Sequence, residues 1–372
     1  MSYPTLASPW SAGALRLPNR LVMPPMVIWK ANKDGTVTEA VLDHYAETPG
    51  AGLVVVEAAA VSPEGRLART QIGIFEDRHV GGLSRLADVV HANGSVASIQ
   101  IHHAGRQTTV RNTFGLPLLA PSAVPSEPGA DLPIELTEGE IERVLGCFVR
   151  AAERAADAGF DAIEIHGAHG YLLSQFHSPL ANRRQDRWGG SLENRAWFLR
   201  ETVRRIRGAV ARRIAITCRL GVADGDAGGL TLDEGIQIAR WLQEDGVCIL
   251  HVSSGIGAPP HMAGEGSLYS DRMQLGIAVK KAVKMPVIGV GDVRHAALAE
   301  QILAAGLVDL VAVGRGLLAD PSWAVKSLGG RESEISVCRN CKVCQQFRHP
   351  ERCPARKALA AADSIALSPA AE

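Results

Sequence analysis

The sequence predicts an α/β protein, folded as a TIM (β/α)8 barrel with a C-terminal extension rich in cysteine. Strand-like and helix-like runs alternate along the chain, and eight such pairs precede residue 330. Four of the seven cysteines then crowd together near the end. We therefore expect a barrel domain over residues 1–330 and an extension over residues 331–372, without a separate second domain.

A doubly wound parallel sheet is the alternative that the same alternation allows. Such sheets usually carry G-x-G-x-x-G after the first strand. Neither that run nor a Walker-type G-x-x-x-x-G-K occurs in the sequence. The sequence therefore favours the barrel.

The expected strands are short runs of apolar, often β-branched residues. They cover residues 20–26, 53–57, 95–101, 162–165, 214–219, 247–252, 286–289 and 309–313. Two of the helices between them open on the capping boxes Thr137-x-x-Glu140 and Thr231-x-x-Glu234. The others are expected over residues 38–47, 77–92, 192–211, 271–283 and 294–305.

Four segments lie outside this alternation. Residues 6–18, with a turn at Gly13, predict a short hairpin that closes the barrel bottom. Residues 107–136 are Pro-rich and residues 254–270 are Gly-rich. Both follow strand ends, so we expect them on the catalytic face as lids or binding loops. Residues 355–372 predict a peripheral helix or a mobile tail.

The composition excludes several kinds of partner. Lys+Arg and Asp+Glu both number 39 and aromatic residues make up only 5%, so we expect neither a nucleic-acid nor a membrane-surface partner. The first residues lack the basic and apolar regions of a secretory signal, and no apolar run reaches membrane-spanning length. We expect a cytoplasmic protein that acts on a small molecule, in an oligomeric state that the sequence leaves open.

The most informative run is DAIEIHGAHGY, residues 161–171, in which a strand breaks into glycines and two histidines. Residues just past a strand's C-terminal end face the active site of a barrel, so His166, His169 and Tyr171 are expected in one pocket. Two imidazoles can hold an electron-rich oxygen, and a nearby phenol can deliver a proton. The competing interpretation, ordinary loop-capping histidines, is weaker for three polar residues at one strand end.

The sequence also bears on two other chemistries that barrel enzymes carry out. No lysine lies between Lys33 and Lys280, which argues against a Schiff-base lysine on a central strand. Metal-dependent hydrolysis needs histidines and carboxylates at several strand ends. The histidines that could contribute are His102, His103, His166, His169, His251 and His261. The first strand, however, ends in Met26-Val27-Ile28-Trp29, which offers no ligand.

The last two strands end in Gly289-Val290-Gly291 and Gly314-Arg315-Gly316. Glycines let backbone N–H groups approach an anion, an arginine can grip it bidentately, and barrels usually bind phosphate at this place. The alternative is that the glycines serve only tight turns. Both glycine pairs together, with Arg315 beside one, predict a phosphate-bearing ligand.

An ordered series of short runs resembles the Old Yellow Enzyme family of FMN-dependent oxidoreductases. The runs are NRLVM (19–23) with Pro25-Met26, VEA (56–58), QIHHAGR (100–106), PSAVPS (121–126), IEIHGAHGYL (163–172), SPLANR (178–183), WGGSLENR (188–195) and VGR (313–315). The series spans nearly all of the barrel, and its order is more specific than any single run.

The resemblance implies an FMN that lies across the barrel mouth. Its expected contacts are Pro25, Met26, Val27 and Ala59 at the ring, Gln100 and Arg219 at the pyrimidine edge, and Gly291, Gly314 and Arg315 at the phosphate. His166 and His169 would bind the activating carbonyl of the substrate. A hydride would pass from flavin N5 to the β-carbon, and Tyr171 would protonate the α-carbon. The charge of Arg219 would stabilise the reduced, anionic flavin.

The chain departs from the family pattern at two positions. Val27 stands where the family often has Thr or Cys near flavin O4, and valine donates no hydrogen bond. Trp29 stands where many members have Tyr near the substrate, and its indole is expected to stack on the substrate instead. Both changes are expected to alter the pocket or the flavin potential.

Cys338, Cys341, Cys344 and Cys353 form the pattern C-x-x-C-x-x-C followed by Cys-Pro. In a cytoplasmic protein such crowding favours metal ligation over disulfides. The pattern looks like a [4Fe–4S] ligand set and is similar to the cluster segment of 2,4-dienoyl-CoA reductases and trimethylamine dehydrogenases. A four-thiolate zinc site, or a segment that binds nothing, is the alternative. We expect the segment at the barrel periphery, near the flavin only if it folds back over the mouth.

The leading hypothesis is an FMN-dependent ene-reductase that oxidises NAD(P)H and reduces an activated C=C bond. One alternative is oxidative demethylation of an N-methylated amine. Another is a flavin-binding electron-transfer protein, with the four-cysteine segment as the docking point for an electron-transfer partner. The histidine pair favours the ene-reductase, because it is suited to a carbonyl or nitro oxygen.

Overall fold

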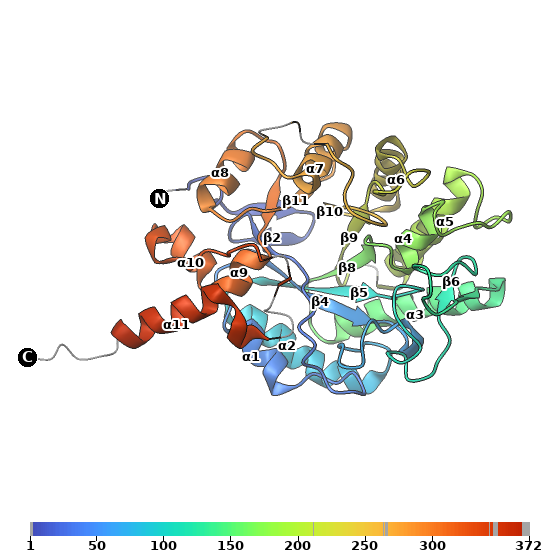
Figure 1. Ribbon diagram of the computed structural model, residues 1–372, viewed down its shortest axis with the longest axis horizontal. Helices are drawn as coiled ribbons and strands as arrows, with labels where there is room; N and C mark the ends of the chain where they lie inside the picture. The colour runs from blue at the N-terminus through green and yellow to red at the C-terminus, as the bar shows by residue number, and fades with distance from the viewer. Residues whose placement is uncertain are drawn as a thin grey trace, which may run out of the picture.

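The computed structural model describes residues 3–210, 212–262, 264, 267–341, 343–344 and 349–366, with side chains as far as residue 360. Eight parallel strands close into a barrel in the order β10-β11-β12-β3-β4-β5-β8-β9, and helices surround it (Figure 1). The strands are β3 (Leu21–Met23), β4 (Leu53–Ala60), β5 (Val96–His102), β8 (Ala162–Gly167), β9 (Ala215–Gly221), β10 (Ile249–Ser253), β11 (Val287–Val290) and β12 (Leu310–Ala312). The predicted barrel is confirmed, because the sheet closes on itself.

The barrel strands agree with the sequence prediction to within three residues at each end. The shortest, β3, ends at Met23 because Pro24 and Pro25 follow it and lack the backbone N–H that a strand ladder requires. Strand β4 runs three residues beyond its predicted end, and its pairing with β5 shifts register between Val56 and Ala59. That irregularity changes the direction of the strand where it reaches the barrel mouth.

The predicted helices are also present. They are α1 (Glu39–Ala46), α2 (Val80–Ala92), α3 (Glu138–Asp157), α5 (Leu192–Val210), α6 (Leu232–Asp245), α7 (Asp271–Ala282) and α8 (Ala296–Ala304). Both predicted capping boxes form: Thr137 accepts from the Glu140 amide while the Glu140 carboxylate accepts from the Thr137 amide, and Thr231 pairs with Glu234 in the same way. Each box satisfies N–H groups that a helix start leaves unpaired.

Several short elements have too little periodicity to be predicted. The short α-helices are α4 (Leu172–His177), α9 (Arg315–Ala319) and α10 (Trp323–Leu328), and the 3-10 helices are η1 (Pro63–Gly65), η2 (Asp77–His79), η3 (Glu332–Glu334) and η5 (Pro350–Arg352). None of the described helices combines the length and apolar character needed to cross a bilayer.

The hairpin expected near the N-terminus is β1 (Trp10–Ala12) paired with β2 (Leu15–Leu17), with Gly13 at φ +55° in its turn. Ala12, Leu15 and Leu17 are buried against barrel residues near the strand starts, among them Val22 and Leu53. The hairpin thus seals the amino-terminal end of the barrel with apolar side chains. A second, larger core fills the space between the strands and the helices.

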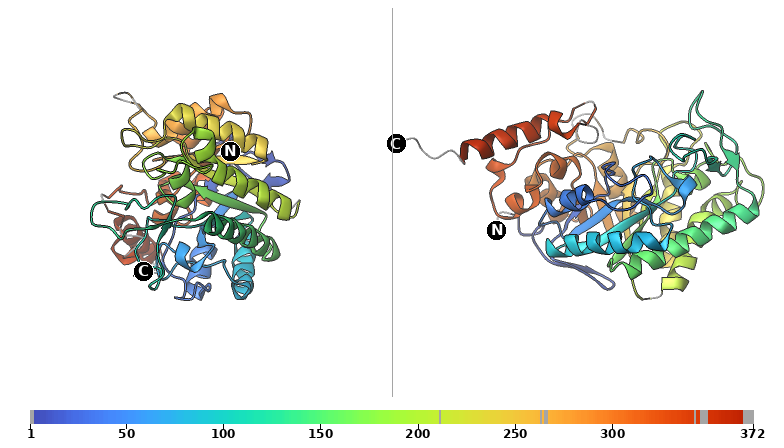
Figure 2. Two further views of the ribbon diagram at one scale, coloured as in Figure 1. Left: turned by 90° about the vertical axis from the view of Figure 1, so that its right-hand side faces the viewer. Right: turned by 90° about the horizontal axis from the view of Figure 1, so that it is seen from below.

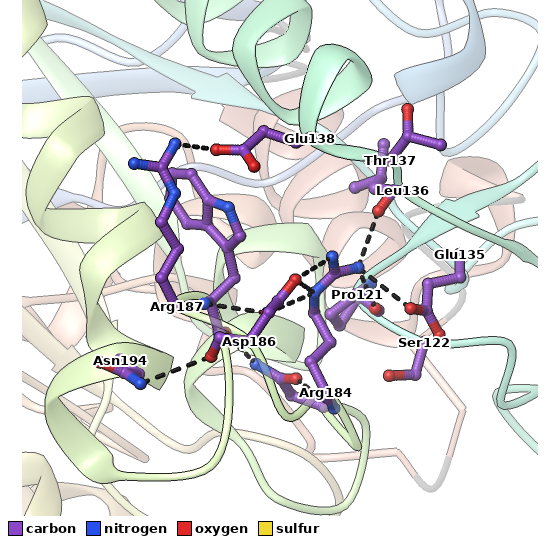
Figure 3. Close-up of polar contacts among 12 residues, drawn as sticks. Pro121, Ser122, Glu135, Leu136, Thr137, Glu138, Arg184, Asp186, Arg187 and Asn194 are labelled. Atoms are coloured by element: carbon purple, nitrogen blue, oxygen red, sulfur yellow. Dashed lines mark hydrogen bonds and ion pairs between the residues drawn. The ribbon is translucent and has the colours of Figure 1, made fainter.

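The predicted loop over residues 107–136 contains a small sheet that the sequence did not reveal. Its strands, β6 (Leu119–Ala120) and β7 (Ile134–Glu135), are parallel and only two residues long. The Arg184 guanidinium anchors this segment, donating to the carbonyls of Pro121 (3.1 Å) and Leu136 (2.7 Å) and pairing with Asp186 (Figure 3). The SPLANR run that carried part of the family resemblance is therefore followed directly by an anchor of the loop.

The C-terminal segment after α10 leads into α11 (Pro354–Ala366), which projects away from the barrel (Figures 1 and 2). Only its base is tied down: Ser336 Oγ donates to the Ala355 carbonyl at 2.7 Å, and Arg356 Nε donates to the Leu318 carbonyl at 2.8 Å. The helix expected over residues 355–372 is thus present as far as residue 366, and residues 367–372 lie outside the described part.

Candidate active site

Two adjoining cavities open at the carboxyl ends of the barrel strands. The central cavity has a volume of about 530 Å³ and the rim cavity about 220 Å³. The central cavity is lined by Pro25, Met26, Val27, Trp29, Ala58, Leu67, Gln100, His166, His169, Tyr171, Arg219, Arg272 and Val290. The rim cavity shares five of these and adds residues that include Gly291, Asp292, Gly314, Arg315 and Cys338. The shared lining makes the two cavities parts of one elongated site.

The histidine pair and Tyr171 line the central cavity together, where the sequence placed them. Their ring centroids lie 5.1 Å apart for His166 and His169 and 4.9 Å apart for His166 and Tyr171. The His166 Nδ1 accepts a hydrogen bond from the Ala168 amide at 3.4 Å, which leaves the ring proton on Nε2. His166 can therefore donate one hydrogen bond to a ligand from Nε2.

His169 occupies the left-handed region at φ +60°, a conformation that a non-glycine residue adopts at some cost. Its Nε2 lies 2.7 Å from the hydroxyl of Ser253, at the end of β10. Because the hydroxyl occupies this nitrogen, Nδ1 is the ring atom left for a ligand. Ser253 therefore orients an imidazole that belongs to the loop after β8, two strands away in the barrel.

Burial sets the protonation states of these groups. It lowers the pKa of both His166 and His169 well below the usual range, so both imidazoles are neutral at neutral pH. Burial raises the pKa of Tyr171, which stays a phenol and keeps its proton. The arrangement offers two neutral N–H donors and one O–H donor, which suits an oxygen that gains negative charge during a reaction.

Gln100 on β5 and Arg219 on β9 form the floor of the central cavity. Burial lowers the pKa of Arg219 to about 10, which still leaves the guanidinium charged at neutral pH. Its Nε is buried and has no hydrogen-bond partner among the described residues. Gln100 donates from Nε2 to Glu164 at 2.7 Å. An arginine with an unused buried donor, beside an amide, fits the polar edge of a flat heterocycle.

The loop after β3 supplies one wall of the central cavity through Pro25, Met26, Val27 and Trp29. Trp29 is held in the left-handed region at φ +59°. The Ile28 amide between Val27 and Trp29 donates to the carboxyl of Glu57 at 3.1 Å. Burial raises the pKa of Glu57 to about 8, and the Ile28 hydrogen bond and the charge of Lys30 offset only part of that rise. A buried carboxyl thus holds the wall that carries the two departures from the family pattern.

The rim cavity contains the glycines predicted to meet a phosphate. Gly291 lies at φ +141°, and a Cβ there would come within 2.2 Å of Ser270 Oγ, so only glycine fits. Arg315 also lines the rim cavity, but its guanidinium is bonded to Asp292 and Asn340. A guanidinium has five N–H donors, so Arg315 can keep both partners and still donate to an anion in the cavity.

Sequence reasoning missed the second cation at this end, Arg272 at the start of α7. It lines both cavities, and its Nε is buried without a hydrogen-bond partner among the described residues. Its position follows from the closing of the barrel, which no local pattern encodes. Of the expected cofactor contacts, Ala59 is fully buried, and its neighbour Ala58 lines the central cavity.

The four-cysteine segment begins at the barrel mouth. Cys338 lines the rim cavity, and Asn340 receives a hydrogen bond from Arg315. The thiols are not gathered: across the described residues, no three His, Cys, Asp or Glu side chains are placed to hold a metal ion. Residues 342 and 345–348, within the segment, lie outside the described part. The predicted four-thiolate arrangement is therefore absent from the segment as it stands.

The described residues also lack a gathered ligand set for the metal-hydrolase alternative. His102 and His103 are buried, and His261 pairs with Asp271 on the surface. Among the described residues, these histidines do not join a group of three or more His, Cys, Asp or Glu side chains that could hold a metal ion. Of the loop over residues 254–270, residues 263, 265 and 266 lie outside the described part.

Comparison with known proteins gives a consistent result. A family model described as the NADH:flavin oxidoreductase / NADH oxidase family matches residues 5–334. An NADH oxidase of Thermoanaerobacter brockii is 45% identical over 92% of the chain, but the match covers 53% of that protein, so the chain spans about half its length. An NADPH dehydrogenase of Bacillus licheniformis is 38% identical, with 87% of this chain and 94% of that protein covered. The old yellow enzyme homologue of Zymomonas mobilis superposes with a TM-score of 0.80 at 26% identity, over 92% of this chain and 96% of that one.

Proposed function

Because the chain belongs to the NADH:flavin oxidoreductase / NADH oxidase family, we propose that it is an FMN-dependent ene-reductase. It takes electrons from NAD(P)H and reduces an activated C=C bond of the enone, enoate or dienoyl type. The observation that carries this proposal is the gathering of His166, His169 and Tyr171 over Gln100 and Arg219 in one cavity. These side chains can bind a substrate oxygen, supply a proton and contact a flavin within one cavity.

The residues present fit an FMN. The central cavity offers the free Arg219 donor and Gln100 for the pyrimidine edge, with the loop of Pro25, Met26 and Val27 as a wall. The rim cavity offers Gly291, Gly314 and Arg315 for the phosphate, with Arg272 between the two ends. When bound, FMN supplies the hydride transfer from nicotinamide to the β-carbon of the substrate.

The protein's own groups then do three things. His166 and His169 hold the carbonyl oxygen of the substrate by hydrogen bonds and stabilise the negative charge that develops there. Tyr171 donates its proton to the α-carbon. Arg219 places a positive charge at the pyrimidine edge, which favours the reduced cofactor. Trp29 shapes the substrate side of the pocket.

The test is anaerobic stopped-flow mixing of the purified protein with NADPH and then with cyclohexenone. We expect the flavin absorbance to bleach with the nicotinamide and to return with the alkene. Bleaching of the oxidised flavin by an N-methyl amino acid without NADPH, and no return of colour with the alkene, would instead assign oxidative demethylation, because that substrate donates electrons to the flavin. No return of colour with the alkene and no bleaching by the amine would leave an electron-transfer protein as the better description.

We propose in addition that Cys338, Cys341, Cys344 and Cys353 bind a metal centre, a [4Fe–4S] cluster or zinc. Their spacing supports this, and the place of Cys338 at the rim cavity would bring such a centre near the flavin. The thiols do not fit a centre as they stand, so binding requires the segment to rearrange. We assign no step of the reaction to it.

A further inference from the structure

A buried polar cluster begins at Gln100, which lines the central cavity, and continues to Glu164 and His251. Glu164 Oε1 accepts from Gln100 Nε2 at 2.7 Å, and Glu164 Oε2 lies 2.8 Å from His251 Nδ1. Glu164 and His251 have no exposed surface, and Gln100 is 2% exposed. The proposed reaction uses Gln100 but gives no role to Glu164 or His251.

The strand order shows how the carboxyl group reaches both partners. Gln100 on β5 stands beside Glu164 on β8 in the ladder, whereas β9 separates β8 from β10, which carries His251. The contact to His251 therefore crosses the barrel interior in front of β9. Arg219, the ladder neighbour of His251, belongs to that intervening strand and lies within the electrostatic reach of Glu164.

The carboxylate decides which end of the Gln100 amide faces the cavity. An ionised carboxylate only accepts hydrogen bonds, so Gln100 must turn its NH2 group toward Glu164. Its carbonyl oxygen is then the end left for the cavity. The polar edge of an isoalloxazine presents one donor, N3–H, between two carbonyls. A fixed amide oxygen is the complement of that donor.

The carboxylate also counters charge. Arg219 is the cation at the floor of the central cavity, and Glu164 is the acidic group that acts on it most strongly. A carboxylate without exposed surface is costly in free energy, and an apolar residue of similar volume would often serve stability as well or better. The position of Glu164 therefore points to the cofactor site rather than to packing.

We propose that Glu164 is a positioning residue of the flavin site, which orients the Gln100 amide and offsets the charge of Arg219, so that it lowers the flavin reduction potential. The inference rests on the proposed function, since it concerns the FMN that this function requires. His251 completes the arrangement by occupying the second carboxylate oxygen.

The test is Glu164→Gln, which preserves shape and removes the charge. With His251 donating to the new amide oxygen, the new NH2 group faces Gln100 and forces its amide to flip. The flipped amide opposes N3–H with another donor, so we expect oxidised FMN to bind at least tenfold more weakly. Without the countercharge, reduced FMN is favoured by at least a further tenfold over oxidised FMN, a rise in potential of about 30 mV.

The double variant Gln100→Glu/Glu164→Gln exchanges the two residues and provides the second measurement. It restores an acceptor for N3–H and returns a carboxylate to the site. We expect FMN affinity to recover to within tenfold of wild type and the potential to fall below that of Glu164→Gln. This variant also keeps the proposal testable if Glu164→Gln does not fold, because a folded exchange variant that has lost FMN binding overturns it.

Asp245→Asn is the matched control. Asp245 is a buried carboxylate that pairs with Arg200 and Arg204 between α5 and α6, away from both cavities. We expect this variant to lose stability and to keep the wild-type flavin potential. A Glu164→Gln protein that holds FMN at the wild-type potential overturns the inference alone. A wild-type protein that takes up no FMN overturns the proposed function and the inference together.

Discussion

The hydroxyl of Ser253 lies 2.7 Å from Nε2 of His169, so a residue at the end of β10 orients an imidazole that follows β8. Two strand ends with β9 between them thus cooperate in one ligand-binding group. The sequence pattern at a single strand end cannot predict such a pair. The proposed role of His169 in ligand binding therefore depends on Ser253, and variants of both residues can test it.

We expect His169→Ala to weaken the binding of phenol-type ligands by about 1.5–3 kcal/mol, because a hydrogen bond to a phenolate oxygen is lost. Ser253→Ala, which only releases the imidazole, should cost less, about 0.5–1.5 kcal/mol. Titration of the oxidised holoprotein, followed by its long-wavelength charge-transfer absorbance, measures both. Unchanged titration curves for His169→Ala would refute the assigned role.

Tyr171→Phe should separate the two half-reactions. The phenol hydroxyl is the proposed proton donor, and the loss of a general acid slows its step by ~10²-fold or more. Flavin reduction by NAD(P)H needs no proton from Tyr171 and should remain close to wild type. Rapid-mixing rates for each half-reaction decide the matter, and equal slowing of both would indicate a structural role instead.

Arg315→Ala should purify folded but mostly without FMN, because the charge-assisted hydrogen bonds from its guanidinium to the phosphate are lost, at a cost of about 1.5–3 kcal/mol. The ratio of flavin to protein absorbance measures the occupancy. Arg331→Ala, which removes a surface arginine paired with Glu334, is the control and should retain its flavin. Full occupancy in Arg315→Ala would reassign the phosphate contact, and Arg272 would be the first residue to examine.

The stability of the protein should depend on Glu57 between about pH 4.5 and pH 8. Its pKa is raised from 4.5 to about 8 in the folded protein. The folded state therefore holds the proton more tightly than the unfolded chain, and the stability gained below pH 4.5 is lost as the pH rises through 8. Glu57→Gln keeps an acceptor for the Ile28 amide and removes this loss, which is on the order of 4 kcal/mol.

Thermal unfolding between pH 5 and 9 tests the role of Glu57, with the exposed Glu127→Gln as the control. We expect the melting temperatures of wild type and Glu57→Gln to diverge as the pH rises, the variant being the more stable. Parallel curves would show that the carboxyl group does not hold its proton in the folded state.

Iron, sulfide and zinc analysis of anaerobically purified protein tests the cysteine proposal. We expect one [4Fe–4S] cluster per chain, with zinc in its place as the alternative. Replacing Cys341 and Cys344 together by Ser should abolish the metal content and leave FMN bound. The proposal fails if all three elements are absent and the four thiols react freely with a maleimide.

The barrel could be predicted because its strands and long helices have local signals. Thr137 and Thr231 announce helices through their capping boxes, and Pro24 and Pro25 explain the early end of β3. The two-residue strands β6 and β7 lack such a signal, since they depend on the contacts of Arg184 with distant carbonyls.

The residues of the candidate site likewise fall into those that a local sequence pattern predicts and those that it does not. His166, His169 and Tyr171 lie within six residues, so one strand end was enough to predict that they share a cavity. Arg272 and Ser253 come from other strand ends and join the site only when the barrel closes. The segment of Cys338 shows the opposite case, where a clear spacing pattern is present without the gathered geometry that it predicts.

The β1–β2 hairpin has a consequence for kinetics. Because its apolar side chains seal the amino-terminal end of the barrel, the nicotinamide and the alkene of the proposed reaction enter and leave by the carboxyl-terminal opening. There they compete for the same central cavity, so the first product must depart before the second substrate binds. Double-reciprocal plots should accordingly give parallel lines, and a high concentration of NAD(P)H should inhibit turnover by occupying the site intended for the alkene.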